Sequence, residues 1–219
     1  MAQADKRSKV AKLTLLGMLT AILIVLGYVN IPMPAGLSIT FNMIPVAVAA
    51  IAMGIPGGLG IGTVFGLISF LQCFNICGTS PLGITLLAQS RDMFVQAGHS
   101  TVTAGLLAGG LMFLQRVVSR TMVGLMAGLI WKGLKKTRVP LYFKGLITGF
   151  AAAFFNTLFF MSTLVLIFSG TPQMASSLAG RGFFAYLAAS VGVNAIVEMA
   201  VSAAVTGAVA VALKKARLV

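Results

Sequence analysis

Two pairs of polar residues lie in apolar stretches of this chain, and each pair has a spacing of four. Arg116 and Arg120 stand in "LQRVVSRTMVG", and Asn194 and Glu198 stand in "GVNAIVEMAV". Residues four apart are neighbours on one face of a helix. Guanidinium groups bind carboxylates through two parallel hydrogen bonds. Because two arginines face one glutamate, a positive charge is left over, and this surplus favours an anionic ligand.

The composition indicates that these residues lie in a membrane. Hydrophobic residues make up 58% of the 219, and Asp5, Asp92 and Glu198 are the only acidic residues in the sequence. Several apolar runs reach about 20 residues, which is enough to cross the hydrocarbon core of a bilayer. We therefore expect an all-α integral membrane protein, with residues 1–219 forming one transmembrane domain.

The net charge of +13 is concentrated in three clusters beside the apolar runs. The clusters are Lys6, Arg7, Lys9 and Lys12; Lys132, Lys135, Lys136, Arg138 and Lys144; and Lys214, Lys215 and Arg217. Positive residues beside spanning segments are typical of the cytoplasmic side. Both termini are therefore expected in the cytoplasm, which requires an even number of spans. Nucleic-acid binding is disfavoured, because it would need a basic, aromatic-rich soluble surface.

The apolar runs predict a bundle of six transmembrane helices. The expected spans are residues 13–29, 39–55, 57–74, 102–134, 142–169 and 184–213. The outer connections, "IPMPAGLSITF", residues 75–100 and "GTPQMASSLAGRG", are rich in turn-forming residues and are expected to be loops. The first run is longer than an ordinary signal-peptide core and lacks a clear cleavage site, so we expect it to remain as a helix.

Glycines at spacing four predict how the helices pack. Such residues are Gly58, Gly62 and Gly66, and the pairs Gly105 and Gly109, Gly124 and Gly128, and Gly145 and Gly149. Small residues at this spacing let helix backbones approach closely in lipid. A dinucleotide fingerprint would need a strand before the glycines, and the apolar run does not provide one.

The polar residues within the spans are the candidate binding site. An ionised side chain at mid-membrane costs about 3 kcal/mol or more, so it normally faces a partner or a wet cavity. One interpretation is a structural ion pair between Glu198 and an arginine, for which Arg116 is the expected partner. The other is a substrate pocket with apolar walls and a few polar groups. The candidate residues are Arg120, Arg116, Asn42, Gln72, Asn156, Asn194 and Glu198.

No group of residues in the sequence favours a catalytic or metal site. His99 is the only histidine, and "CFNIC" supplies two cysteines, Cys73 and Cys77, which are too few for a structural zinc site. We expect the cysteines to pack, with a disulfide as the alternative. The sequence contains no Walker motif, so we predict no enzyme activity, no ATP hydrolysis by this chain and no cofactor.

Four stretches, in order, resemble the substrate-binding S components of energy-coupling factor (ECF) vitamin transporters. They are "LGMLTAILIVLG", the run from "SITFNMIP" through "SPLGITLL", "SRTMVGLMAGLIWKGL" and "NAIVEMAV". In the first of them Gly17 and Ala21 occupy the two small positions. The second is most similar to a pantothenate-type branch. Ser119 departs from the proline expected before Arg120, and "AQSRDMFVQAGHS" lacks the family's Asn-Pro turn.

This resemblance implies a bacterial cell-membrane protein that binds a vitamin from outside, beneath outer loops, and docks through Gly17 and Ala21. The partners would be a transmembrane coupling subunit and two ATPase subunits, which drive uptake. Pantothenate is the expected vitamin, since a small carboxylate with an amide and hydroxyls suits the arginines and asparagines. The alternatives are another vitamin (a thiamine precursor, riboflavin or folate), or a stand-alone secondary transporter or channel in which Glu198 relays protons.

Overall fold

The fold is a bundle of long helices whose outer connections contain short elements of their own. The structure, a computed structural model, describes residues 2–29, 31–32, 38–178 and 183–216. The elements are α1 (Ala2–Tyr28), β1 (Ile31–Pro32), β2 (Ser38–Ile39), α2 (Met43–Met53), α3 (Ile55–Leu71), the 3₁₀ turn η2 (Gln72–Phe74), α4 (Pro81–Gln96), α5 (Thr101–Phe113), the π turn η3 (Leu114–Val118), α6 (Ser119–Lys135), α7 (Leu141–Phe168), α8 (Pro172–Leu178) and α9 (Phe183–Lys215).

Five helical segments among the described residues are long and apolar enough to cross a membrane. They are Val10–Tyr28, Ile55–Phe74, Thr101–Lys135, Leu141–Phe168 and Ala195–Lys215. These segments match five of the six predicted spans. The segment Thr101–Lys135, the predicted fourth span, is one continuous rod made of α5, η3 and α6, as the apolar run predicted.

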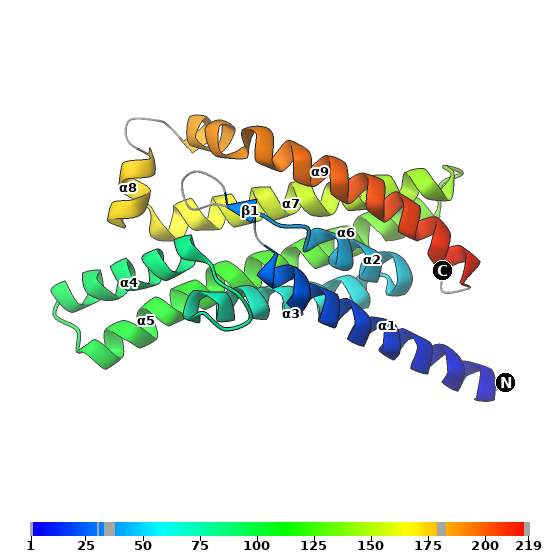
Figure 1. The fold of residues 1–219 in the computed structure, drawn as a ribbon, viewed down its shortest axis with the longest axis horizontal. Helices are drawn as coiled ribbons and strands as arrows, with labels where there is room; N and C mark the ends of the chain where they lie inside the picture. The colour runs from blue at the N-terminus through cyan, green and yellow to red at the C-terminus, as the bar shows by residue number, and fades with distance from the viewer. Residues whose placement is uncertain (1, 30, 33–37, 179–182, 217–219) are drawn as a thin grey trace.

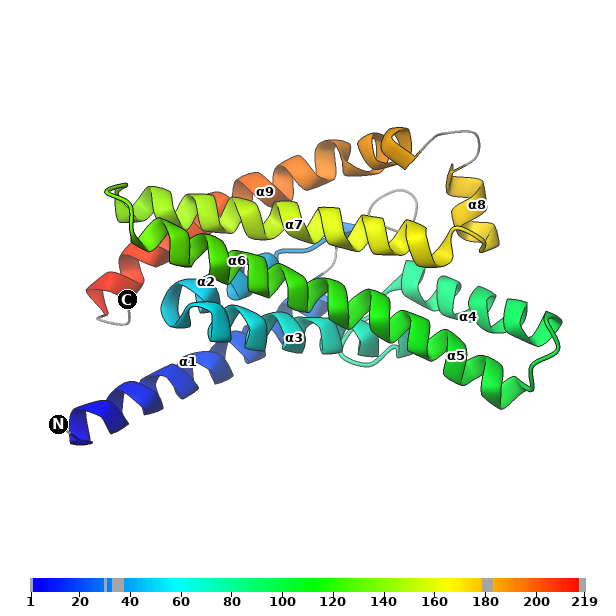
Figure 2. The same cartoon turned by 180° about the vertical axis from the view of Figure 1, so that it is seen from behind.

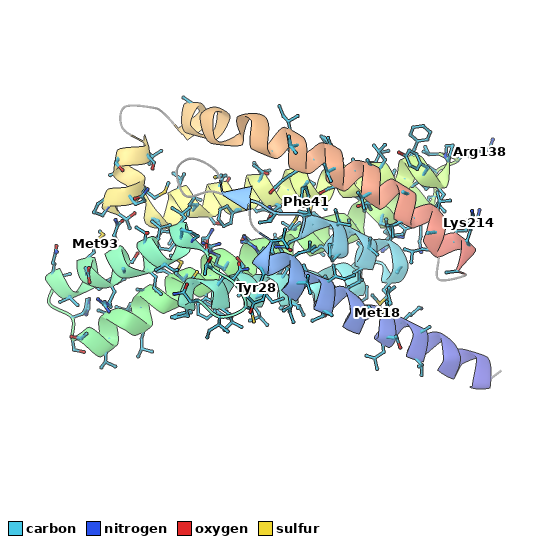
Figure 3. All side chains as sticks on the ribbon, viewed as in Figure 1. Met18, Tyr28, Phe41, Met93, Arg138 and Lys214 are labelled. Atoms are coloured by element: carbon cyan, nitrogen blue, oxygen red, sulfur yellow. The ribbon has the colours of Figure 1, made fainter. Side chains whose placement is uncertain are left out.

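Figures 1 and 2 show how these helices are arranged. Helices α3, α5–α6, α7 and α9 run side by side, and α1 leans away from them toward the N-terminus. Both chain ends lie at one end of the bundle, and α8 with the turn between α4 and α5 lies at the other. Arg138 and Lys214 lie at the end that holds the termini, whereas Met93 lies at the opposite end (Figure 3).

The predicted second span, residues 39–55, contains the helix α2 from Met43 to Met53 and ends at Ile55, the first residue of α3. Eleven residues at about 1.5 Å each cover roughly half of a ~30 Å hydrocarbon core, so α2 alone does not cross it. The helix is almost wholly buried, and it packs on α3, α6, α7 and α9. The chain before it is not helical: β1 and β2 pair as a short antiparallel hairpin, with Ile31 opposite Ile39.

The prediction that the outer connections are loops was wrong at three places. Residues 31–39 contain the β hairpin, residues 75–100 contain the 16-residue helix α4, and the connection after α7 contains α8. Serine and proline explain the start of α4, because Ser80 accepts a hydrogen bond from the Gly83 N–H and Pro81 occupies the first helical turn. These residues were treated as loop formers, but they also begin helices.

Glycine contacts between α3 and α6 confirm the predicted close approach of these helices. A Cβ atom added to Gly62 would lie 2.7 Å from the Arg120 carbonyl oxygen, and one on Gly66 would lie 2.7 Å from the Val117 Cα. Gly58 and Gly124 meet backbone to backbone, so that a side chain on either would collide with the other. Only residues without a side chain permit this contact.

The remaining glycine pairs divide into two groups. Gly145 and Gly149 face α9, where a Cβ atom on Gly145 would lie 2.7 Å from the Ala210 Cβ. For Gly105 and Gly109 the prediction of a helix contact was wrong within the described part of the chain, because added Cβ atoms would meet nothing within 4 Å. Their helix, α5, is peripheral, and Leu106 on it is 73% exposed.

We predict that Gly124→Ala destabilises the protein by about 1–3 kcal/mol, because the new methyl group overlaps the backbone of Gly58 and forces α3 and α6 apart. Gly60→Ala is the matched control: Gly60 is also in a helix of this pair, but a Cβ there meets nothing within 4 Å, so a change within ~0.5 kcal/mol is expected. Thermal unfolding in detergent measures both. Equal effects of the two substitutions would contradict the contact.

Candidate functional site

The candidate site lies where the middle of the long α5–α6 rod meets α3 and α7. The guanidinium carbons of Arg116 and Arg120 lie 5.1 and 4.7 Å from the centroid of the Phe160 ring. Arg120 also lies 4.6 Å from the ring centroid of Phe65, on α3. Contacts of cations with aromatic faces are favourable, more so where water is excluded. The spacing of four thus brings both arginines to one face, as the sequence predicted.

The π turn η3 lies at this point of the rod and contains Arg116. Single π turns inside α-helices are rare, and they occur frequently at functional sites. This one also contains Gln115, whose side chain is completely buried and whose amide oxygen and nitrogen have no hydrogen-bond partner among the described residues. Sequence reasoning missed Gln115, although it directly precedes Arg116.

Arg116 is held in place by hydroxyl groups. Its Nη1 donates to the Ser69 Oγ at 3.2 Å, and its Nη2 donates to the Ser80 Oγ at 3.1 Å. Ser80 is also the residue that caps the N-terminus of α4. Arg116 therefore joins three elements, α3, α4 and the π turn. Neither serine was among the candidate residues, since hydroxyls beside an arginine are not visible in the sequence without the fold.

Arg120 has fewer partners than Arg116. Its Nε and Nη1 atoms are buried without a hydrogen-bond partner in the described part of the chain, and only 7% of the residue is exposed. The two arginines repel each other electrostatically. A buried donor without a partner loses its hydration and gains nothing in return, at a cost of about 1–3 kcal/mol or more for a charged group. The Nε and Nη1 of Arg120 are therefore donors that no described residue satisfies.

Glu198 does not form the ion pair that we expected with Arg116. Among the described residues the one ion pair within 4.0 Å joins Arg91 and Asp92 on the surface. The Glu198 Oε1 instead accepts a hydrogen bond of 2.7 Å from the backbone N–H of Thr40. Glu198 attracts Arg120 electrostatically over a longer distance. The physical reason is that the chain before α2 brings an N–H without a helical partner to this carboxylate.

The predicted amide residues occupy different positions. Asn42 is 2% exposed, at the start of α2, and Asn156 lies one turn before Phe160 on α7; the Oδ1 atoms of both have no hydrogen-bond partner among the described residues. Asn194 lies one turn before Glu198 on α9, and its side chain is outside the described residues.

Gln72 has a structural role in this arrangement. Its Nε2 donates to the carbonyl oxygens of Gly27 at 3.1 Å and of Cys77 at 3.3 Å. These bonds join the end of α1 to the turn after α3. Because its amide nitrogen already has two acceptors, Gln72 is the weakest of the predicted ligand contacts.

The helix register gives the order of these groups along the bundle. Gly149 on α7 contacts Ser202 on the antiparallel α9, so Glu198 lies level with a point on α7 four residues after Gly149, near Ala153. Asn156 is about one turn from Phe160 and about one turn from this level. The arginines with Phe160, then Asn156, then Glu198 follow one another from the α4–α8 end inward.

The other reactive residues do not form a site. Cys73 and Cys77 are free thiols, so the alternative of a disulfide is not seen, and Cys73 is buried beside Ser69, to whose carbonyl it donates. His99 packs against Phe94 at the α4–α5 turn. Among the described residues, no three or more His, Cys, Asp or Glu side chains lie together so that they could hold a metal ion.

Comparison with known protein families matches residues 11–210 to the family described as "ECF transporter, substrate-specific component". The chain belongs to this family. No curated protein matches it in a sequence comparison. The membership makes this S component a multi-pass membrane protein and a substrate-binding transport subunit. ECF S components work with a membrane coupling subunit and ATPases.

We predict that Ser80→Ala destabilises the S component more than Ser100→Ala. Both serines cap a helix, accepting from Gly83 and Thr103 respectively, and loss of a cap costs about 1 kcal/mol. Only Ser80 also binds Arg116, so its loss should cost a further ~1–3 kcal/mol for the unpaired guanidinium. Chemical or thermal unfolding in detergent gives the difference. Indistinguishable variants would show that the serine contributes nothing to holding the arginine.

Proposed function

We propose that this S component binds a small carboxylate vitamin, pantothenate, at high affinity for ATP-driven uptake. One observation carries the proposal: two buried arginines share one aromatic ring, and no described carboxylate lies within ion-pair distance of either. Two buried positive charges without a described carboxylate in ion-pair contact favour the binding of an anion. A carboxylate would supply that charge and accept two parallel hydrogen bonds from one guanidinium.

Arg120 is the arginine that we assign to the carboxylate. Both Nη atoms of Arg116 already donate to serines and only its Nε has no partner among the described residues, whereas both the Nε and the Nη1 of Arg120 have none. A guanidinium binds a carboxylate in the bidentate manner through Nε and Nη2 or through both Nη atoms, so each of these edges of Arg120 includes one atom without a partner among the described residues. The rings of Phe65 and Phe160 hold the guanidinium plane in position, which reduces the entropy lost on binding.

The uncharged part of the ligand would be recognised by amide side chains. Asn42 and Asn156 each have an unpartnered oxygen, which suits the amide N–H and hydroxyl groups of pantothenate. We assign Asn194 the same role from its position on α9, and Gln72 a minor one. Gln115 joins this set as a new candidate, because its buried amide has no partner among the described residues.

Other vitamins fit these groups less well. Riboflavin would need a flat aromatic surface, but Trp131 is buried and lies beside Lys135, at the end of the bundle away from the arginines. A thiamine precursor would need a free acid, but Glu198 already accepts from Thr40. A stand-alone secondary transporter would move its substrate without partner subunits and would respond to a proton gradient, which transport assays can test.

We propose that both termini and the α6–α7 connection face the cytoplasm. Their basic residues gather at one end of the bundle, where Figure 3 places Arg138 and Lys214. The positive-inside rule assigns that end to the cytoplasm. The α4–α8 end of the bundle then faces the outside. The hairpin with α2 forms the second of six crossings, in which irregular backbone replaces the outer half of a helix.

The exposed face of α1 is the proposed docking surface for the coupling subunit. Gly17 and Ala21 are exposed, and a Cβ on Gly17 would meet nothing within 4 Å. Few of the α1 side chains after residue 9 are buried, among them Leu19 and Leu23. Two small residues one turn apart leave a shallow path along the helix, which a partner helix can approach closely.

We predict that Ala21→Trp abolishes uptake by the complete transporter while the isolated S component still binds its ligand, because the indole blocks the close approach of a partner helix. Ile22→Trp is the matched control, since Ile22 is also exposed, at 45%, but already carries a large side chain and points about 100° away. Uptake in reconstituted vesicles and ligand binding in detergent are measured in parallel. Loss of binding together with uptake would indicate internal packing instead.

We predict that Arg120→Ala weakens pantothenate binding by at least ~2 kcal/mol, about thirtyfold, because the ligand's carboxylate then lies desolvated without its partner. The uncharged amide analogue of pantothenate should lose far less affinity. Isothermal titration of the detergent-extracted protein gives both constants, and mass spectrometry of the ligand that co-purifies tests the identity of the vitamin. Equal losses for acid and amide, in this variant and in Arg116→Ala, would rule out carboxylate recognition by these arginines.

A further inference from the structure

We infer that Glu198 is a positioning residue: its carboxylate holds the backbone segment 38–42 against α9 and so fixes Asn42 beside the site. This role differs from the counter-charge for an arginine that the sequence suggested, and from direct contact with the ligand. The inference rests on the proposed function only for its affinity measurement. Its structural measurement needs no ligand.

Segment 38–42 lies deep within the bundle and is largely without regular secondary structure. The β pairing ends at Ile39, and α2 begins only at Met43, so the backbone between them belongs to neither element. Phe41 lies near the middle of the long axis of the bundle in Figure 3, and β2 contacts α9. In a bilayer, non-helical backbone at such depth is stable only where the protein satisfies its polar groups.

A hydrogen bond to α9 satisfies a polar group of this segment. Thr40 donates its N–H to the Glu198 Oε1 at 2.7 Å, between residues 158 positions apart in the chain. Glu198 itself is only 6% exposed. A buried carboxylate needs donors and a buried N–H needs an acceptor, so one short hydrogen bond removes both deficits. The contact is therefore a specific attachment of this segment to α9.

The hydrogen bond between Thr40 and Glu198 also affects the position of Asn42. Asn42 follows Thr40 by two residues and stands immediately before α2, where its side chain makes no capping bond. Its buried Oδ1 is one of the unpartnered oxygens assigned to the ligand. Because Thr40 is fixed to Glu198, the point at which the chain enters α2, and with it Asn42, is set by α9. Loss of the bond should release this side of the site.

The test compares two substitutions of the same residue. Glu198→Gln keeps an acceptor oxygen at the same length but removes the charge, whereas Glu198→Ala removes the acceptor. We expect amide hydrogen exchange of residues 38–42, measured in detergent by mass spectrometry, to stay near wild type in Glu198→Gln and to rise at least about tenfold in Glu198→Ala. Exchange in α5 should change in neither variant.

Thr40 provides a second, matched pair. Thr40→Pro removes the N–H, and the residue before it lies in β2, which suits the extended backbone that proline requires of its predecessor. Thr40→Ala keeps the N–H. The proline variant should behave like Glu198→Ala and the alanine variant like wild type. This pair decides the question even if Glu198→Ala fails to fold.

Pantothenate binding gives the functional readout. Glu198→Ala and Thr40→Pro should weaken it at least about tenfold, while Glu198→Gln should bind as well as wild type or more tightly, because a negative charge near an anion site is gone. If Glu198→Gln loses binding and exchange protection as Glu198→Ala does, the charge matters and the inference is wrong. If Thr40→Pro leaves exchange unchanged, it is also wrong. If wild type binds no pantothenate, the proposed vitamin fails, while the exchange results still decide this inference.

Discussion

The site depends on the backbone contact between α3 and α6. Gly62 lies against the carbonyl oxygen of Arg120, and Gly66 lies against Val117 and the carbonyl of Arg116. The helices therefore touch at the turns that carry the two arginines. This contact brings Phe65, between the two glycines, to the guanidinium of Arg120. A side chain at either glycine would push α3 away from the rod and separate the Phe65 ring from the Arg120 guanidinium. The two glycines therefore determine the position of the arginine, although they do not contact it with a side chain.

The charge of the site is unequally distributed over its residues. Arg116 has hydroxyl partners and joins α3 to α4, and Glu198 has a backbone partner and joins α9 to the segment before α2. Both ionised groups thus hold elements together. Within the described part of the chain, Arg120 contacts two aromatic rings and is attracted by a more distant carboxylate. Arg116 and Glu198 therefore have structural roles, and we assign ligand recognition to Arg120. The sequence alone does not distinguish the three.

The sequence predicted the features that depend on hydrophobic periodicity and on the free-energy cost of burying charge. It did not predict which side chains contact one another, because the tertiary structure determines those contacts. Long apolar runs predicted five spanning helices, and the glycine spacing predicted the approach of α3 to α6. The spacing of the arginines predicted their common face, but Phe160 could not be distinguished from the other phenylalanines of "FFNTLFF". The apolar stretch of residues 39–55 predicted one spanning helix, but α2 covers only Met43–Met53. A buried loop and a buried helix can have the same apolar composition, so the sequence does not distinguish them. Ser80 stands before Pro81, which is a helix-start signal that the loop prediction for residues 75–100 overlooked.

The π turn Leu114–Val118 has a consequence for how this rod can change length. A π turn contains one residue more than the α-helical turn it replaces, and each residue of an α-helix accounts for a rotation of about 100°. A chain with one residue deleted there could continue as a regular helix of nearly the same length. Because the π turn absorbs the rotation of its extra residue, the two halves would stay in phase: with Arg120 kept at Phe160, the face of α5 with Met112 would stay buried. A one-residue deletion in the π turn therefore preserves the core at the α4–α8 end, whereas the same deletion in the regular helix α5 would rotate part of its buried face by about 100°.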